Sequence, residues 1–391
     1  MDRPRYLELP AREDLAEKML FIAGPRQVGK TTLARRIMAA SESGAYFNWD
    51  NRGDRAEIRA AHWPGGDALV VLDEIHKWRS WKSWLKGEFD RHRDRLRFLV
   101  TGSARLDVYR RGGDSLQGRY HHYRLHPFTL AEAAGKTHAP PAEPGTELAI
   151  PGRGSRETLD ALMQFGGFPE PFFAASSRSL RRWQKERFER FFREDVRDLE
   201  SVRDLASLQL LADLLPGRVS SPLSLNSLRE NLEVSHRALT HWMEIFERLY
   251  YIFRVRPHSA SQVRSLQKMS KAYLWDWSVV PSEGARFENL VASHLHKFCN
   301  FLEDREGHKV ELRYLRDRTG KELDFLVTLG RKPWFAVEAK LSETAVDPAL
   351  KYFRERLKIP WVYQVVRDTR RDFVEAGVRV LPAERFLGAL V

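Results

Sequence analysis

The chain has 391 residues, of which 42% are hydrophobic and 30% charged, and this predicts a globular protein with two to four domains. A single cysteine, Cys299, excludes an intrachain disulfide, and neither a signal peptide nor an apolar run of membrane-spanning length is visible. The net charge of +12 favours a polyanionic partner such as nucleic acid, although a uniformly basic surface gives the same total.

A glycine-rich loop follows the first predicted strand, residues 19–23. Its sequence is Gly24-Pro25-Arg26-Gln27-Val28-Gly29-Lys30-Thr31, which has the G-x-x-x-x-G-K-T spacing of a nucleoside-triphosphate phosphate-binding loop. The glycines let backbone N–H groups point at phosphate oxygens, Lys30 reaches the β- and γ-phosphates, and the Thr31 hydroxyl ligates Mg²⁺. A helix is predicted from Thr32 to residue 40, and its positive N-terminal end adds to the field on the anion. We therefore expect ATP and Mg²⁺ as cofactors, with Thr32 completing the binding set.

Strands and helices alternate up to about residue 135, as in a parallel α/β sheet. A strand is predicted at residues 45–49, and the unbroken apolar run 68–72 predicts a central strand covered on both faces. That strand ends in Asp73 and Glu74, at the edge of the sheet where ligands bind. Asp73 is predicted to hold Mg²⁺ together with Thr31, and Glu74 to orient or deprotonate the attacking water.

A third apolar strand, residues 97–100, leads into the segment Thr101-Gly102-Ser103-Ala104-Arg105. Here the chain resembles the AAA+ ATPases, and the resemblance implies that Ser103, or else Thr101, senses the γ-phosphate. The resemblance is more specific to one group, the bacterial and archaeal ATP-binding proteins with an AAA+ module and a C-terminal domain of unknown function. It rests on the segments Asp73–Lys77, Leu116–Arg119 and His126–Phe128. In those proteins a Gly-Arg pair stands where Gly118-Arg119 stands here. Arg119 is therefore the candidate arginine finger for a neighbouring subunit's site, with Arg105 as the alternative.

Three tryptophans, Trp78, Trp81 and Trp84, recur at every third residue after the acidic pair. At that spacing they line one side of a helix. A stacking platform for bases is one interpretation, but packing against a neighbouring domain or subunit is favoured because tryptophan is mostly buried.

The middle of the chain is predicted to be helical. Residues 136–157 are rich in proline and glycine and are expected to form a linker, and residues 158–215 a helical segment. In residues 216–260, two short helices capped by Ser224 and Ser235 precede a strand-like stretch, which is the plan of a winged helix-turn-helix. If this module binds DNA, its second helix offers residues such as Arg237 to the groove and Arg254 and Arg256 to phosphates, whereas Glu244 and Glu247 argue against DNA.

The last third, residues 270–391, contains a second chemical pattern. Asp324 lies on one predicted strand, and Glu338 and Lys340 share one face of the next. This acid, followed by Glu-x-Lys, resembles the PD-(D/E)xK nucleases, whose acids hold Mg²⁺ or Mn²⁺ and whose lysine assists water attack. Glu288 matches the acid that this family often has on a preceding helix. Strand carboxylates and lysines also form ordinary salt bridges, so cleavage is not implied by the pattern alone.

Taken together, the sequence predicts an AAA+ core in residues 1–135, a linker, a helical segment, a winged helix and a restriction-endonuclease-like α/β domain. The predicted function is ATP hydrolysis that powers or gates action on DNA, in a cytoplasmic homo-oligomer such as a hexameric ring. One alternative is a nucleotide-operated switch that binds a protein partner without cleaving nucleic acid. A P-loop kinase is disfavoured because Asp73 and Glu74 suit water activation better than transfer to an acceptor.

Overall fold

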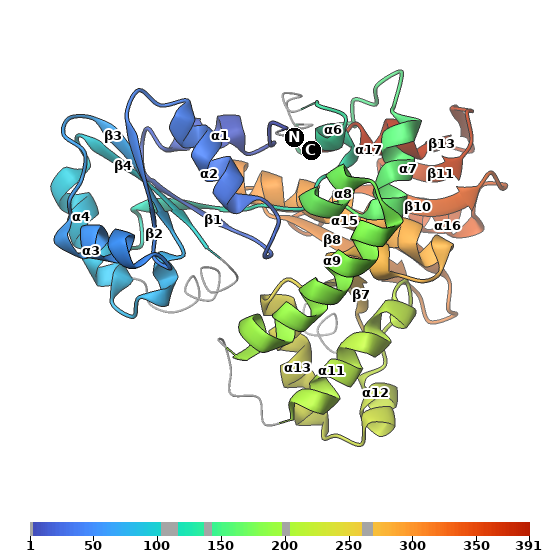
Figure 1. Cartoon of the computed structure of the whole chain (residues 1–391). Coiled ribbons are helices and arrows are strands. Elements are labelled where there is room, and N and C mark those ends of the chain that lie inside the picture. Colours follow the sequence, from blue (N-terminus) through green and yellow to red (C-terminus); the bar gives the residue numbers. More distant parts are fainter. Residues whose placement is uncertain (1–2, 103–115, 137–142, 198–203, 260–268) are drawn as a thin grey trace. The chain divides into compact units, whose positions relative to one another are not determined.

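The computed structural model describes residues 3–102, 116–136, 143–197, 204–259 and 269–391. By its internal contacts the chain forms two compact units, Met1–Pro127 and Phe128–Val391, called unit 1 and unit 2 below (Figure 1). In the described residues, no helix combines the length and the apolar character needed to cross a membrane.

Unit 1 is a parallel five-stranded sheet in the order β2-β3-β4-β1-β5, which confirms the predicted α/β fold. Its central strands β1 and β3 are buried along their whole length because helices and loops cover both faces. The edge strand β5 was not predicted, since its sequence Tyr-His-His-Tyr-Arg has no apolar run. The strands are β1 (Met19–Ala23), β2 (Gly44–Asn48), β3 (Ala68–Asp73), β4 (Leu96–Thr101) and β5 (Tyr120–Arg124). The helices are α1 (Glu8–Asp14), α2 (Lys30–Ala39), α3 (Arg52–Ala60), the 3-10 turn η1 (Ile75–Lys77) and α4 (Trp81–His92).

The three tryptophans pack within unit 1. Trp78 precedes α4 and stacks on Trp49 with ring centroids 5.0 Å apart, while Trp81 is buried in the core. Trp84 contacts both Trp78 and Trp63. Packing rather than an open platform for bases is therefore confirmed, but the predicted partner, a neighbouring domain or subunit, is wrong, because the rings pack against residues of unit 1 itself.

Unit 2 is built on an eight-stranded mixed sheet in the order β12-β13-β11-β10-β9-β8-β6-β7. The long helix α15 (Glu283–Glu306) packs on β8, β9 and β10, and α16 (Pro348–Leu357) packs on β9 and β10. Strands β8, β9 and β10 are antiparallel neighbours, and β11 joins β10 in parallel. The strands are β6 (Ile252–Pro257), β7 (Lys271–Leu274), β8 (Val310–Arg316), β9 (Glu322–Leu329), β10 (Lys332–Ser342), β11 (Trp361–Asp368), β12 (Phe373–Glu375) and β13 (Val378–Pro382).

Several shorter helices complete unit 2. They are α6 (Leu130–Ala133), α7 (Arg156–Phe165), α8 (Pro169–Ala174), α9 (Ser177–Arg190), α11 (Leu205–Leu214), α12 (Leu225–Leu232), α13 (His236–Arg248) and α17 (Ala383–Leu387). A π-helical turn, Phe191–Val196, continues α9, and the 3-10 turns η3 (Leu215–Arg218) and η4 (Trp277–Val279) follow α11 and β7. The hydroxyls of Ser224 and Ser235 accept hydrogen bonds from the backbone N–H groups of Ser227 and Ala238, so both predicted N-caps are confirmed.

The helix pair α12–α13 leads directly into the large sheet. Strand β6 pairs with β7 on one side and with β8 on the other, so the expected wing strands form the end of the eight-stranded sheet. The proline-rich stretch before α7 has no helix or strand in residues 143–155, as expected of a loop. It is nevertheless packed, because Trp334 donates its indole N–H to the Thr146 carbonyl and a side chain on Gly154 would meet the Glu384 backbone at 2.3 Å.

Candidate functional sites

The glycine-rich loop connects the carboxyl end of β1 to the first turn of α2. Gly24 has φ +154°, and a Cβ there would lie 2.5 Å from the Leu125 carbonyl oxygen, so only glycine fits. Gly29 has a left-handed φ of +100° at the N-cap of α2. Together these conformations curl the predicted binding residues, Gly24 to Thr31, into a loop at the N-terminal end of a helix, where backbone N–H groups meet an anion.

Lys30 lies across this loop. Its ammonium donates to the carbonyl oxygens of Gly24 at 3.0 Å and Pro25 at 2.7 Å, and the residue is 8% exposed. The loop is also braced from the N-terminal segment, because Arg5 donates to the Val28 carbonyl at 2.8 Å and to the His126 carbonyl at 2.6 Å. Arg5 was not predicted from the sequence, since nothing in its local pattern points to a segment more than twenty residues away.

Asp73, at the carboxyl end of β3, is the centre of a hydrogen-bond network with side chains from α2, β2 and β4. Its Oδ2 atom accepts hydrogen bonds from the Thr31 hydroxyl and the Tyr46 hydroxyl, both at 2.7 Å, and its Oδ1 atom accepts one from Thr101 at 2.6 Å. Burial and the bond to Asp73 raise the pKa of Tyr46. The predicted pair Thr31 and Asp73 is thus in direct contact, and Asp73 is 3% exposed.

These residues fit a Mg²⁺ ion. Magnesium is usually held by one or two carboxylates together with substrate phosphates, and a hydroxyl and a carboxylate lie here beside the phosphate-binding loop. Thr31 and Asp73 are the groups that would hold it. Tyr46 was missed by the sequence analysis, although the parallel register of β2 and β3 places its strand beside Asp73.

Glu74 has different contacts from those of Asp73. It has a left-handed φ of +59°, and its carboxylate lies 3.1 Å from the Lys77 ammonium, which also donates to Asp50 at 2.6 Å. Burial lowers the pKa of Lys77, but the Asp50 hydrogen bond and the attraction of Glu74 outweigh it, and the net direction is upward. The side chain of Glu74 is about one-fifth exposed, at 21%, so water reaches it.

Two predicted residues, Ser103 and Arg105, lie outside the described residues. Thr101, the alternative sensor, is fully buried and uses its hydroxyl on Asp73. Arg119 forms a two-point ion pair with Asp90, at 2.7 and 3.0 Å. Arg119 directly precedes β5, whose first residue pairs with Met19, so it lies at the amino ends of the strands. The length of β1, roughly 16 Å, separates this end of the sheet from the glycine-rich loop.

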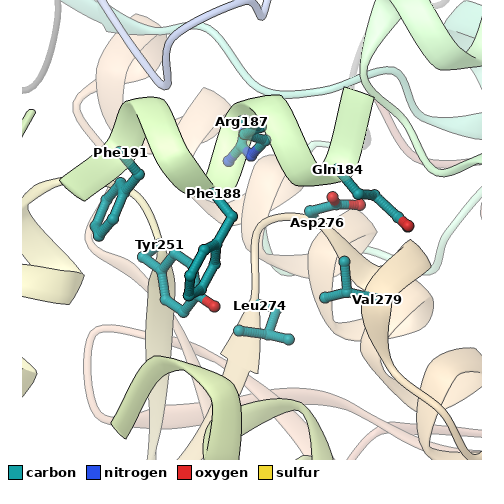
Figure 2. A pocket seen from close by; sticks show the side chains of 8 residues that line it. All are labelled: Gln184, Arg187, Phe188, Phe191, Tyr251, Leu274, Asp276 and Val279. Atoms are coloured by element: carbon teal, nitrogen blue, oxygen red, sulfur yellow. The ribbon is translucent and has the colours of Figure 1, made fainter. Parts of the chain in front are cut away.

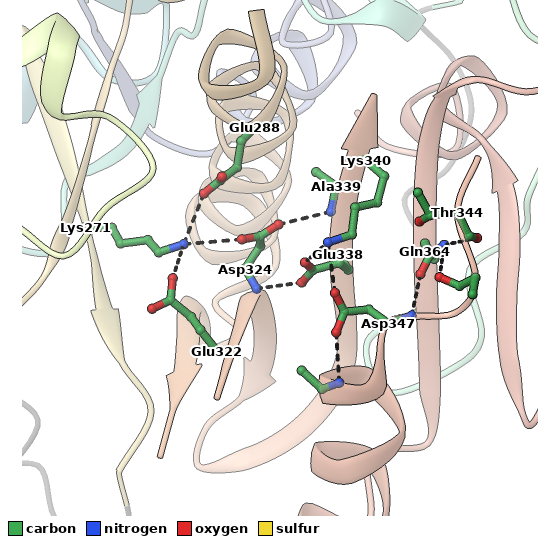
Figure 3. A network of polar contacts seen from close by, with 12 residues as sticks. Lys271, Glu288, Glu322, Asp324, Glu338, Ala339, Lys340, Thr344, Asp347 and Gln364 are labelled. Atoms are coloured by element: carbon green, nitrogen blue, oxygen red, sulfur yellow. Dashed lines mark hydrogen bonds and ion pairs between the residues drawn. The ribbon is translucent and has the colours of Figure 1, made fainter. Parts of the chain in front are cut away.

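The four nuclease-like residues come together in unit 2 from α15, β9 and β10 (Figure 3). The backbone N–H of Asp324 donates to Glu338 at 3.2 Å, and the N–H of Ala339 donates to Asp324 at 3.1 Å. Lys340 donates to Glu338 at 2.8 Å and to Asp347 at 2.9 Å. Burial raises the pKa of Glu338, an effect strengthened by the Asp324 charge and opposed by Lys340.

A fifth residue, Lys271 on β7, joins this cluster and was not predicted. Its ammonium lies 2.8 Å from Glu322, 3.1 Å from Glu288 and 3.3 Å from Asp324. Burial by itself lowers the pKa of Lys271, but the three carboxylates outweigh burial and raise it. Tyr273, two residues along β7, donates to Glu288 at 2.7 Å. No local pattern in the sequence connects Lys271 with residues 288, 322 and 324.

In this arrangement a lysine ammonium, not a free space, lies between the carboxylates of Glu288 and Asp324. Among the described residues, no group of three or more His, Cys, Asp or Glu side chains is placed to hold a metal ion. Figure 3 shows the Lys271 ammonium at the point where the carboxylates of Glu288 and Asp324 converge.

The exposed side of the predicted recognition helix carries His236, Arg237 and His241, while Leu239, Trp242 and other apolar residues are buried. Arg254, a predicted phosphate contact, forms an ion pair with Glu247 and is 18% exposed. Its guanidinium is therefore engaged within the chain, and Arg256 is partly buried.

A small, largely apolar pocket that opens to solvent lies beside α9 in unit 2 (Figure 2). Its lining includes Phe188, Tyr251 and the polar residues Gln184, Arg187 and Asp276. Burial lowers the pKa of Arg187 and raises that of Asp276. None of the residues predicted from the sequence as site residues lines this pocket.

Family models match three parts of the chain. An AAA domain matches residues 16–134, and two domains of unknown function, DUF8612 and DUF4143, match residues 156–283 and 283–386. An uncharacterized protein of Mycobacterium tuberculosis is 22% identical over 94% of this chain and 81% of its own length. An uncharacterized protein of Methanocaldococcus jannaschii is 26% identical over 51% of this chain and 46% of its own length.

Solved structures with some likeness to the chain include a Walker-type ATPase of Pyrococcus abyssi, at 14% identity and a TM-score of 0.43, covering 71% of this chain and 94% of that one. Another is the Orc1 protein of Aeropyrum pernix in complex with DNA, at 13% identity and a TM-score of 0.35, covering 75% and 94%.

Proposed function

We propose that this protein, which carries an AAA domain in residues 16–134 and a DUF4143 domain in residues 283–386, binds ATP with Mg²⁺ and hydrolyses it in unit 1. The observation that carries the proposal is the contact between Thr31 and Asp73, with Lys30 lying across the same loop. A hydroxyl, a carboxylate and an ammonium thus lie beside backbone N–H groups at a helix N-terminus. Phosphoryl transfer uses these groups to hold Mg²⁺ and the phosphates.

Each residue has a role in this proposal. Lys30 exchanges the carbonyls of Gly24 and Pro25 for the β- and γ-phosphates and neutralises their charge. Thr31 and Asp73 hold Mg²⁺, which when bound screens the charge that develops on the phosphate oxygens. Tyr46 and Thr101 hold the Asp73 carboxylate in place. Glu74 orients the attacking water once its carboxylate is released from Lys77.

Arg119 is proposed as an arginine finger that acts on a neighbouring subunit. It lies at the amino ends of the strands, away from the loop of its own unit, and Asp90 holds its guanidinium at an exposed position. This placement requires a homo-oligomer, and a hexameric ring is the proposed form. Ser103 remains the proposed sensor of the γ-phosphate, outside the described residues.

Hydrolysis is proposed to gate the binding of DNA by unit 2. The support is the net charge of +12 and the exposed His236, Arg237 and His241 on α13, which follows α12 as in a winged helix-turn-helix. The antiparallel β8, β9 and β10 with Asp324, Glu338 and Lys340 support a restriction-endonuclease-like fold for the C-terminal part. The alternative is a protein-binding switch, favoured by the ion pair that engages Arg254 with Glu247.

An ATPase assay with and without single-stranded, duplex and branched DNA tests the proposal. We expect Mg²⁺-dependent phosphate release from the wild type and none from Lys30→Ala, whereas Lys86→Ala on α4 serves as a matched lysine control and keeps its turnover. Unchanged turnover in Lys30→Ala would overturn the ATPase assignment. DNA affinity that falls steeply with salt supports the DNA role and argues against the protein switch, whereas no detectable binding of DNA favours the switch.

A further inference from the structure

We propose that the ammonium of Lys271 permanently fills the position between Glu288 and Asp324 that a divalent cation would take, so the C-terminal centre works without metal and does not cleave nucleic acid. The proposal rests on the nuclease-like interpretation of these residues given above. It assigns unit 2 the role of a binding module whose charged centre is neutralised by the chain itself.

The distances show how completely Lys271 occupies this position. Its Nζ atom lies within 3.3 Å of three carboxylates, from Glu288 on α15 and from Glu322 and Asp324 on β9. A lysine ammonium has three hydrogens to donate, and here each has a carboxylate partner at hydrogen-bond distance. A metal bound to Glu288 and Asp324 would have to share this space with a positive charge, which Coulomb repulsion in a buried site opposes.

The backbone of Lys271 is held by strand pairing. It pairs with Val255 in the β6–β7 ladder and forms an isolated bridge with Pro222 on the other side. The residue is 1% exposed, and its ammonium lies 5.7 Å from the centre of the Tyr314 ring. These pairings fix the backbone from which the buried side chain reaches the carboxylates.

The carboxylates of Asp324 and Glu338 have further partners within the chain. Asp324 accepts the Ala339 N–H on Oδ2, while Glu338 accepts the Asp324 N–H on Oε2 and the Lys340 ammonium on Oε1. All four oxygens of Asp324 and Glu338 therefore have a partner within the chain, counting the contact between Lys271 and Oδ1 of Asp324. The centre is a closed network of carboxylates, amides and two lysines that joins β7, α15, β9 and β10 (Figure 3).

Binding of Mn²⁺ to the full-length chain tests the proposal, measured by titration calorimetry and by the loss of the free-ion EPR signal. We expect the wild type and Asp324→Asn to bind the same number of Mn²⁺ ions, since the metal taken up in unit 1 does not involve Asp324. Lys271→Met keeps the length of the side chain but lacks the charge, so it should bind about one more Mn²⁺ ion per chain. That extra ion should be lost in Lys271→Met/Asp324→Asn.

Two results would overturn the proposal: binding of Mn²⁺ by the wild type that Asp324→Asn removes, or the absence of an extra ion in folded Lys271→Met. If Lys271→Met does not fold, as judged by circular dichroism and gel filtration, the comparison of wild type with Asp324→Asn decides alone. ATP hydrolysis is measured on the same samples, and Lys332→Met serves as an exposed control. Because hydrolysis depends on unit 1, its presence or absence tests the ATPase proposal separately.

Discussion

His294 on α15 gives unit 2 a predicted sensitivity to acid. Its Nε2 atom accepts the backbone N–H of Leu130 at 2.9 Å, while Nδ1 lies 2.7 Å from the Leu290 carbonyl and donates to it. The ring is therefore neutral and holds the first turn of α6. Burial lowers the pKa of His294 to about 3, with the Lys297 ammonium acting in the same direction and the Leu290 carbonyl and Glu132 opposing it.

The sign and size of the effect follow from linkage. An unfolded histidine takes up a proton near pH 6.5, whereas the folded His294 remains neutral down to about pH 3, so acid favours the unfolded state. The free energy of unfolding should fall by about 1.4 kcal/mol between pH 7.5 and 5.5 from this residue alone. Each further pH unit down to the folded pKa costs about 1.4 kcal/mol more.

Urea unfolding of the wild type and His294→Gln at pH 7.5 and 5.5, followed by circular dichroism, measures this effect. Glutamine can still accept the Leu130 N–H but does not titrate, so its stability deficit relative to the wild type should shrink by about 1.4 kcal/mol at the lower pH. His62→Gln, whose histidine side chain is 69% exposed, is the control and should change with pH as the wild type does. A deficit of His294→Gln that is equal at both pH values would refute the reasoning.

Three further predictions concern unit 1. Tyr46→Phe removes one hydrogen bond to Asp73. It should raise the Mg²⁺ concentration for half-maximal ATP hydrolysis by about two- to tenfold, with kcat at saturating Mg²⁺ little changed. An unchanged Mg²⁺ requirement would show that Tyr46 does not position Asp73. Glu74→Gln should lower kcat by about 10²- to 10⁴-fold while a fluorescent ATP analogue still binds, and full turnover would rule Glu74 out as the group that activates water. Arg119→Ala should lower the rate of ATP turnover by at least about 10³-fold. Asp90→Ala should keep the wild-type rate, because Asp90 only pairs with the Arg119 guanidinium. Equal losses in both variants would indicate that this ion pair is structural.

The sequence by itself determined the parts of this protein that lie within one short segment. The loop from Gly24 to Thr31, the apolar strands β1 and β3 and the serine caps at Ser224 and Ser235 were all predicted. Each depends on neighbouring residues, because backbone geometry, apolar periodicity and capping act over a few positions.

The tertiary structure alone decided the contacts between distant segments. Tyr46 meets Asp73 only because β2 and β3 pair in register, and Lys271 meets Asp324 although 53 positions separate them. The strand β5 is likewise defined by its pairing with β1, since its own sequence carries no apolar run. Such contacts depend on how strands align in a sheet, and no pattern of nearby residues encodes that alignment.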